Sequence, residues 1–193
     1  MRSALLVVDV QYDFCTGGAL AVRDSDHVVA AMRRYVASAV DHDVPVYASR
    51  DWHPAVTSHF AKYGGTWPVH CVQHTHGADF HADLHLSDAA IVVTKGTDAD
   101  RPGYSAFDGR TPDGRSLIDD LRSRGVSRLY VGGLATDYCV RQSALDALDA
   151  GLEVTLLGDA IAGVDLNPGD AARALTELGA KGAVILPSLA AIE

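Results

Sequence analysis

Cysteine is scarce in this sequence, with three residues (Cys15, Cys71 and Cys139) in a chain of 193. A small odd number in a chain of this length argues against a disulfide scaffold and favours a reducing compartment. A recognisable signal peptide is lacking too, because the apolar start at 4–10 is short and leads directly into polar residues. No apolar run approaches the length of a membrane span. We therefore expect a cytoplasmic protein.

Positive charge is the second deficit, since 16 Lys and Arg face 25 Asp and Glu, for a net charge of −9. This balance disfavours nucleic acid and anionic membranes as partners, and we expect neither. Internal repeats, low-complexity tracts and interdomain linkers are absent as well. Hydrophobic residues make up 48% of the chain, enough for a substantial core. We expect one domain over residues 1–193 that binds a small molecule.

Short runs rich in β-branched residues are what the sequence does contain. They are apolar throughout rather than alternating, which is typical of strands buried on both faces. They lie at 4–10, 44–50, 90–95, 128–134, 152–157 and 183–187. Helical patterns lie between most of them, at 25–42, 116–124, 138–150 and 168–179. The alternation predicts an α/β fold, a doubly wound and mainly parallel six-stranded sheet with helices on both faces.

Residues able to do chemistry follow four of these strands. Asp9, Asp51 and Lys95 end the first three, and Cys139 follows the fourth. In open parallel sheets, ligands bind outside the carboxyl ends of the strands, at the point where strand order reverses. The long irregular stretches 51–89 and 96–115 begin at the same ends, and loops of that length are usually functional. We expect the site there.

Asp9, Lys95 and Cys139 could supply a general base, a cation that tunes it, and a nucleophile. The glycines before the cysteine would allow a tight turn and a close approach to a ligand. Thr136 or Asp137 could cap the following helix, whose positive end would favour the thiolate of Cys139. The alternatives are a structural aspartate and an inert buried cysteine.

Histidine is concentrated in one loop, because seven of nine histidines fall within 53–85. Asp51 and His53 are two residues apart, so in extended backbone they project to the same side, and His59 and His70 follow. An aspartate with several histidines suits one zinc, iron or manganese ion. Taken alone, each histidine is better explained as a solvated loop residue, and only the clustering favours a metal. The pattern leaves open which of them bind.

Motifs along residues 4 to about 165 are similar to one known family. They are VVDVQYDF, RDWH, GTWPVHCVQ, HGADFH, VTKG, GYSAF and GGLATDYCVRQSALDA. Together, and in this order, they resemble the nicotinamidase (pyrazinamidase) branch of the isochorismatase-like hydrolases. TWPVHCVQ joined to GGLATDYCV indicates this branch rather than isochorismatase itself.

The resemblance implies a role for each matching residue. The catalytic trio would be Asp9, Lys95 and Cys139, and the metal ligands would be Asp51, His53, His59 and His70. Substrate would contact Phe14, Trp67, Leu134 and Ala135, with the N–H groups of Ala135 and Cys139 as the oxyanion hole and a cis peptide between Leu134 and Ala135.

The reaction implied is hydrolysis of nicotinamide, with pyrazinamide as a second candidate substrate, to the acid and ammonia through a cysteine thioester, as part of NAD salvage. One divalent ion, zinc first, would serve as cofactor, and a homo-oligomer is compatible with the family. Two other functions stay open: a related amidohydrolase for a different small amide, and a metal or redox sensor.

The sequence also departs from the family pattern. Tyr12 stands where asparagine is common, and Val69 replaces a common second proline. His74 and His76 occupy positions where glycine and proline are frequent, and we expect both to be solvated. The roles of His81 and His85 are left open.

Overall fold

Six parallel strands make up the sheet in the computed structural model, which describes residues 2–192. The strands are β1 (Arg2–Val8), β2 (Val46–Asp51), β3 (Ile91–Lys95), β4 (Val126–Leu134), β5 (Glu153–Ala162) and β6 (Val184–Leu186). Their order is β3-β2-β1-β4-β5-β6, and every pairing is parallel. The predicted doubly wound sheet is confirmed, and it is parallel throughout.

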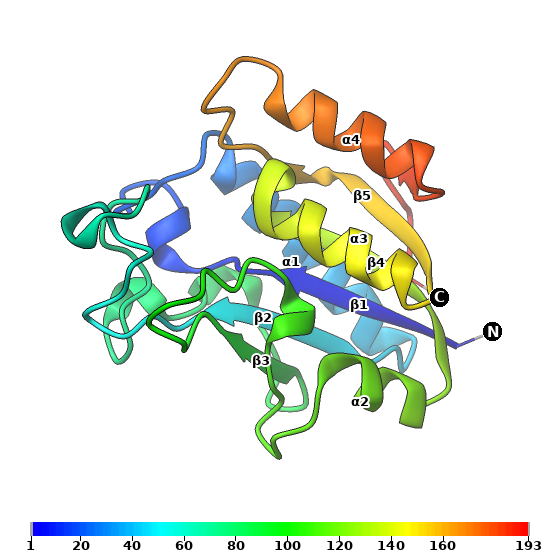
Figure 1. Ribbon diagram of the computed structural model, residues 1–193. Coiled ribbons are helices and arrows are strands. Elements are labelled where there is room, and N and C mark those ends of the chain that lie inside the picture. The colour runs from blue at the N-terminus through cyan, green and yellow to red at the C-terminus, as the bar shows by residue number, and fades with distance from the viewer. Residues whose placement is uncertain (1, 193) are drawn as a thin grey trace.

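Helices cover both faces of this sheet, as expected (Figure 1). They are α1 (Ser25–Asp41), α2 (Leu117–Ser123), α3 (Arg141–Asp149) and α4 (Asp170–Ala180). Strand β1 shows the two layers directly. Leu5 and Val7 pack with α1, while Leu6 and Val8 pack with the other three helices, and all four side chains are fully buried. A strand between two helical layers must be apolar on both faces, which explains its unbroken hydrophobic run.

Strand order reverses at β1. The chain runs outward from β1 through β2 to β3, then returns to place β4 on the other side of β1. A crevice forms at such a reversal, outside the carboxyl ends of the strands. Figure 1 shows that the blue-green and green loops gather at these carboxyl ends, opposite the two termini. Among the described residues, no helix is long and apolar enough to cross a membrane.

The third helix pattern, at 138–150, begins differently from the prediction. Helix α3 starts at Arg141 rather than at 138, because Thr136–Val140 form a wider π-type turn. Such turns are rare and frequently lie at functional sites. This one carries Cys139.

Candidate active site

Asp9 leaves the end of β1 with its side chain fully buried. Its backbone has φ of 48°, in the left-handed region that aspartate tolerates better than most residues. Two contacts with β2 hold it, since the Asp9 N–H donates to the Ser49 carbonyl (3.1 Å) and the Ser49 hydroxyl donates to Asp9 Oδ1 (2.7 Å). The carboxylate therefore lies fixed at the strand-order reversal.

Lys95 joins the strand-end groups. Its ammonium lies 2.8 Å from Asp9 Oδ2, 2.6 Å from Asp51 Oδ1 and 3.4 Å from Cys139 Sγ. Sheet register explains part of this arrangement, because Asp51 and Lys95 are direct partners at the ends of β2 and β3. The contact with Asp9 is an ion pair between the Lys95 ammonium and Asp9 Oδ2. The predicted trio is brought together.

Burial and charge set the protonation of these groups. Burial raises the pKa of Asp9, an effect that the neighbouring Lys95 opposes. Burial alone would lower the pKa of Lys95, but the carboxylates of Asp51 and Asp9 raise it well above its usual value. Burial also raises the pKa of the Cys139 thiol well above normal, against the pull of Lys95. Burial thus opposes the thiolate that the helix end was expected to favour.

The turn around Cys139 corrects one further expectation and confirms another. Neither Thr136 nor Asp137 caps the helix. The Asp137 carboxylate instead accepts hydrogen bonds from the N–H groups of Val164 and Asp165, at 2.9 and 2.8 Å. It thereby ties the cysteine turn to the segment after β5. The predicted cis peptide between Leu134 and Ala135 is confirmed.

The two glycines before this turn lie inside β4 and not in a turn. Gly133 has φ of 125°, and a Cβ at this position would lie 2.1 Å from the carbonyl oxygen of Val8. Only glycine allows β4 to lie this close to β1. Gly133 is therefore required for strand packing at the reversal point.

Three histidines from the long loop meet beside the charged cluster. A ring nitrogen from each of His53, His59 and His70 lies within 4.8 Å of the others. Backbone carbonyls orient two of the rings, because His53 Nδ1 contacts the Gly96 carbonyl at 3.0 Å and His70 Nδ1 contacts the Pro68 carbonyl at 2.7 Å. Such contacts fix the tautomer that leaves Nε2 free.

The fourth predicted ligand lies next to this group. Asp51 Oδ2 is 3.6 Å from His53 Nε2, so Asp51 contacts Lys95 with one oxygen and faces the histidines with the other. His53 Nε2 is buried, and it has no hydrogen-bond partner among residues 2–192. Burial lowers the pKa of His59 to about 4 and lowers that of His70, so both are neutral near pH 7. Neutral imidazoles and a carboxylate around an unpartnered nitrogen suit a divalent metal ion.

The remaining histidines lie apart from this group. His74, His76 and His85 are exposed and His81 is partly exposed, which agrees with the expected solvation of the first two. The rings of His76 and His81 lie 4.0 and 4.8 Å from that of Tyr12, whose hydroxyl accepts a hydrogen bond from Ala82 N–H. The unusual tyrosine and histidines thus pack against one another. Val69, the other departure, is 44% exposed.

An apolar pocket opens between the cysteine and the histidines. The predicted residues that line it are Phe14, Trp67, Leu134 and Ala135, together with Asp51, His59, His70 and Cys139. The prediction missed other lining residues, namely Leu20, Val22, Tyr104, Tyr138 and Val164. Tyr104 and Tyr138 belong to the motifs GYSAF and ATDYCV, and these motifs could have indicated that both tyrosines lie at the pocket. Tyr104 also holds the pocket wall, because its hydroxyl accepts a hydrogen bond from Trp67 Nε1 at 2.9 Å.

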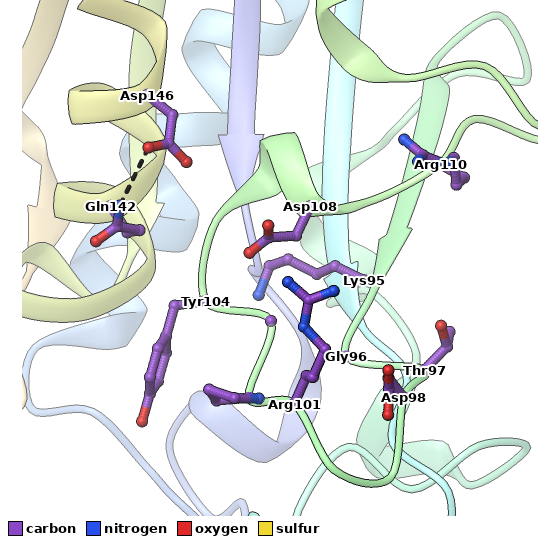
Figure 2. A pocket seen from close by; sticks show the side chains of 12 residues that line it. Lys95, Gly96, Thr97, Asp98, Arg101, Tyr104, Asp108, Arg110, Gln142 and Asp146 are labelled. Carbon is purple, nitrogen blue, oxygen red and sulfur yellow. Dashed lines mark hydrogen bonds between the residues drawn. The ribbon is translucent and has the colours of Figure 1, made fainter. Parts of the chain in front are cut away.

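A larger, polar cleft of about 590 Å³ adjoins this pocket. Figure 2 looks into the cleft, with Tyr104 on one side and Arg110 on the other. Tyr104 lines both spaces, and the cleft also reaches Lys95. Side chains of both charges line the cleft, including Asp108 and Arg101. A flat aromatic molecule is better matched by the apolar pocket.

Comparison with known proteins agrees with this geometry. The Isochorismatase domain family matches residues 3–188. The nicotinamidase of Escherichia coli is 41% identical over 198 residues, covering 94% of this chain and 93% of that protein. The nicotinamidase/pyrazinamidase of Mycobacterium tuberculosis is 44% identical over 167 residues, covering 85% and 88%. Pyrococcus horikoshii pyrazinamidase in complex with zinc has a TM-score of 0.89 at 42% identity, covering 96% of this chain and 99% of that one. The chain belongs to the isochorismatase domain family, within its nicotinamidase branch of amidohydrolases.

Proposed function

We propose that the protein hydrolyses nicotinamide to nicotinate and ammonia, a reaction of NAD salvage, and that residues 1–193 form a single hydrolase domain. The observation that carries the proposal is the contact of Lys95 with Asp9 and Cys139 beside three gathered histidines. Cys139 then lines one apolar pocket together with Asp51, His59 and His70, and Lys95 links Cys139 to the buried Asp9. Relatives named nicotinamidase support the choice of substrate.

Substrate binding would use both sides of the pocket. Phe14 and Trp67 would enclose the aromatic ring, and Leu134 and Ala135 would line the wall beside Cys139. Asp51, His53, His59 and His70 would hold one divalent ion, zinc first, with iron or manganese as alternatives. When bound, the ion supplies a Lewis-acid site for the nitrogen of a pyridine or pyrazine ring. This arrangement would place the carboxamide toward the cysteine.

Bond cleavage would begin with Asp9 accepting the Cys139 thiol proton. The raised pKa of Asp9 makes it a better base, and the raised pKa of Cys139 makes a base necessary. The sulfur attacks the amide carbon, and the N–H groups of Ala135 and Cys139 stabilise the oxyanion. The C–N bond then breaks, and Asp9 returns its proton to the departing ammonia. A thioester between Cys139 and the acyl group remains.

Water would complete the cycle. Asp9 takes a proton from water, whose oxygen attacks the thioester carbon; the C–S bond breaks, and the proton returns to sulfur. The products are nicotinate and the free thiol. Lys95 would keep Asp9 oriented and would stabilise its charged form through these transfers.

Ammonia release from nicotinamide tests the proposal. The purified protein would be assayed before and after chelation, and again after zinc, iron or manganese is added back. We expect activity that falls on chelation and returns with a metal ion, and none from Cys139→Ala. Folded protein that releases no ammonia from nicotinamide with any of these ions would contradict the proposed substrate. Parallel assays of other small amides would then identify a related amidohydrolase.

A further inference from the structure

Gln11 lies between the strand ends and the histidine loop, and the mechanism above gives it no role. It follows Asp9 by two residues, and its side chain is fully buried. Three hydrogen bonds of 2.8 Å use its amide. Oε1 accepts from the N–H of Asp51, while Nε2 donates to the carbonyls of Asp51 and Ala78.

This pattern holds the two peptide groups that flank Asp51. A carboxamide carries a donor and an acceptor in one plane, so it can pair with the N–H and the C=O of the same residue. Gln11 pairs in this way with Asp51, at the last position of β2. The second hydrogen on Nε2 reaches Ala78 in the histidine loop. Backbone bonds alongside, from Tyr12 N–H to the Asp79 carbonyl (3.0 Å) and from His81 N–H to the Val10 carbonyl (3.0 Å), join the same two segments.

We propose that Gln11 is a positioning residue for the metal ion, acting through Asp51. Asp51 must direct one oxygen to Lys95 and the other toward His53, which requires a fixed main chain. Gln11 fixes the main chain at Asp51. Its amide is neutral, so it adds no charge beside the charged groups of Asp9, Asp51 and Lys95. The inference rests on the proposed metal ligands, and it goes beyond them because Gln11 touches neither ion nor substrate.

Zinc affinity and cobalt spectroscopy separate this role from a merely structural one. Gln11→Glu keeps the shape of the side chain but replaces the Nε2 donor with an oxygen that faces two carbonyls. Gln11→Met removes all three hydrogen bonds without adding charge. Gln73 offers a matched control, since its Nε2 donates to the next backbone carbonyl, that of Trp52, at 3.0 Å. Gln73→Glu and Gln73→Met repeat the two changes one residue beyond Asp51.

The zinc dissociation constant would be measured by competition with a chromophoric chelator, and site geometry by the d–d absorption of the cobalt(II) form. We expect both Gln11 variants to bind zinc about 10- to 100-fold more weakly, the usual effect of residues that orient a ligand. Their cobalt spectra should also change. The Gln73 variants should match the wild type in both measurements.

Circular dichroism would confirm that each variant is folded. A folded Gln11 variant with wild-type zinc affinity and cobalt spectrum would overturn the proposal, as would an equal loss in the Gln73 variants. Failure of both Gln11 variants to fold would also overturn it, because Gln11 would then serve the core. Wild-type protein that binds zinc but releases no ammonia contradicts only the proposed reaction, whereas wild-type protein that binds no zinc contradicts the metal ligands themselves.

Discussion

The candidate site has two halves that are built in different ways. One half consists of charged groups at strand ends, namely Asp9, Asp51 and Lys95, which the register of three neighbouring strands aligns. The other half is the histidine loop, residues 52–90, where side-chain contacts with backbone carbonyls orient the rings. The first half carries buried charge that must be paired, whereas in the second half burial lowers the pKa values of His59 and His70.

This difference suits a site that holds buried charge beside residues able to bind a metal ion. A buried ammonium is tolerable only between carboxylates, and parallel strands supply these at fixed spacing. A histidine ligand instead needs a free ring nitrogen. A loop can direct several such nitrogens to one point, which a single extended strand cannot do. Asp51 belongs to both halves, because it contacts Lys95 and faces His53. We therefore expect damage to the first half to affect the reaction, and damage to the second to affect ligand binding.

Removal of the Cys139 sulfur should have the largest effect. We expect Cys139→Ala to lower kcat by about 10⁴-fold or more, because the acyl group would have no nucleophile. The fold should persist, since the change removes one atom. Ammonia release and circular dichroism check this prediction. Cys15→Ala, at a buried cysteine outside the pocket, is the control and should remain active, and turnover by Cys139→Ala close to that of the wild type would refute its role as nucleophile.

Loss of one loop ligand should rank second. We expect His53→Ala to carry far less than one zinc per chain after dialysis and to raise KM more than it lowers kcat, because its nitrogen has no other partner among residues 2–192. Elemental analysis and steady-state kinetics would measure both. His74→Ala, at an exposed histidine, should keep zinc and activity. Full zinc content in His53→Ala would show that His53 is not needed for zinc binding.

A shift in pH dependence should be smaller. We expect kcat/KM to fall as pH drops through the pKa of Asp9, because protonated Asp9 cannot act as a base. Burial raises this pKa, so the acid limb should lie above that of an ordinary aspartate. The Ser49 hydroxyl lowers the same pKa, so Ser49→Ala should move the limb to higher pH. If the acid limb of the kcat/KM profile of Ser49→Ala stays in place or moves to lower pH, Asp9 is not the group whose proton transfer limits the rate.

The smallest effect on the kinetics should come from a change at Tyr104, which lines both the apolar pocket and the polar cleft. Tyr104→Phe removes one hydrogen bond to Trp67, which contributes about 0.5–1.5 kcal/mol, so KM should rise about 2- to 10-fold with kcat nearly unchanged. Tyr63→Phe, at an exposed tyrosine, provides the control. A fall in kcat without any change in KM would place Tyr104 in the reaction half instead.

Periodicity and strand-end position were enough to predict the sheet, its helices and the candidate trio, because unbroken apolar runs require burial on both faces. The π-type turn at Thr136–Val140 was not predictable in this way, because its hydrogen bonds involve no distinctive spacing. The raised pKa of Cys139 was missed for a related reason, since desolvation depends on neighbours from β1, β2 and β3 that sequence position does not place.

By itself, the sequence determined the α/β fold, the strand ends that bear Asp9, Asp51 and Lys95, and the loop that concentrates histidine. Local pattern suffices there, because burial and backbone periodicity act along the chain. Only the tertiary structure decided which histidines converge, why Gly133 must be glycine, and how Gln11 holds Asp51. These depend on distances between segments far apart in sequence, and such distances exist only once β1 lies between β2 and β4.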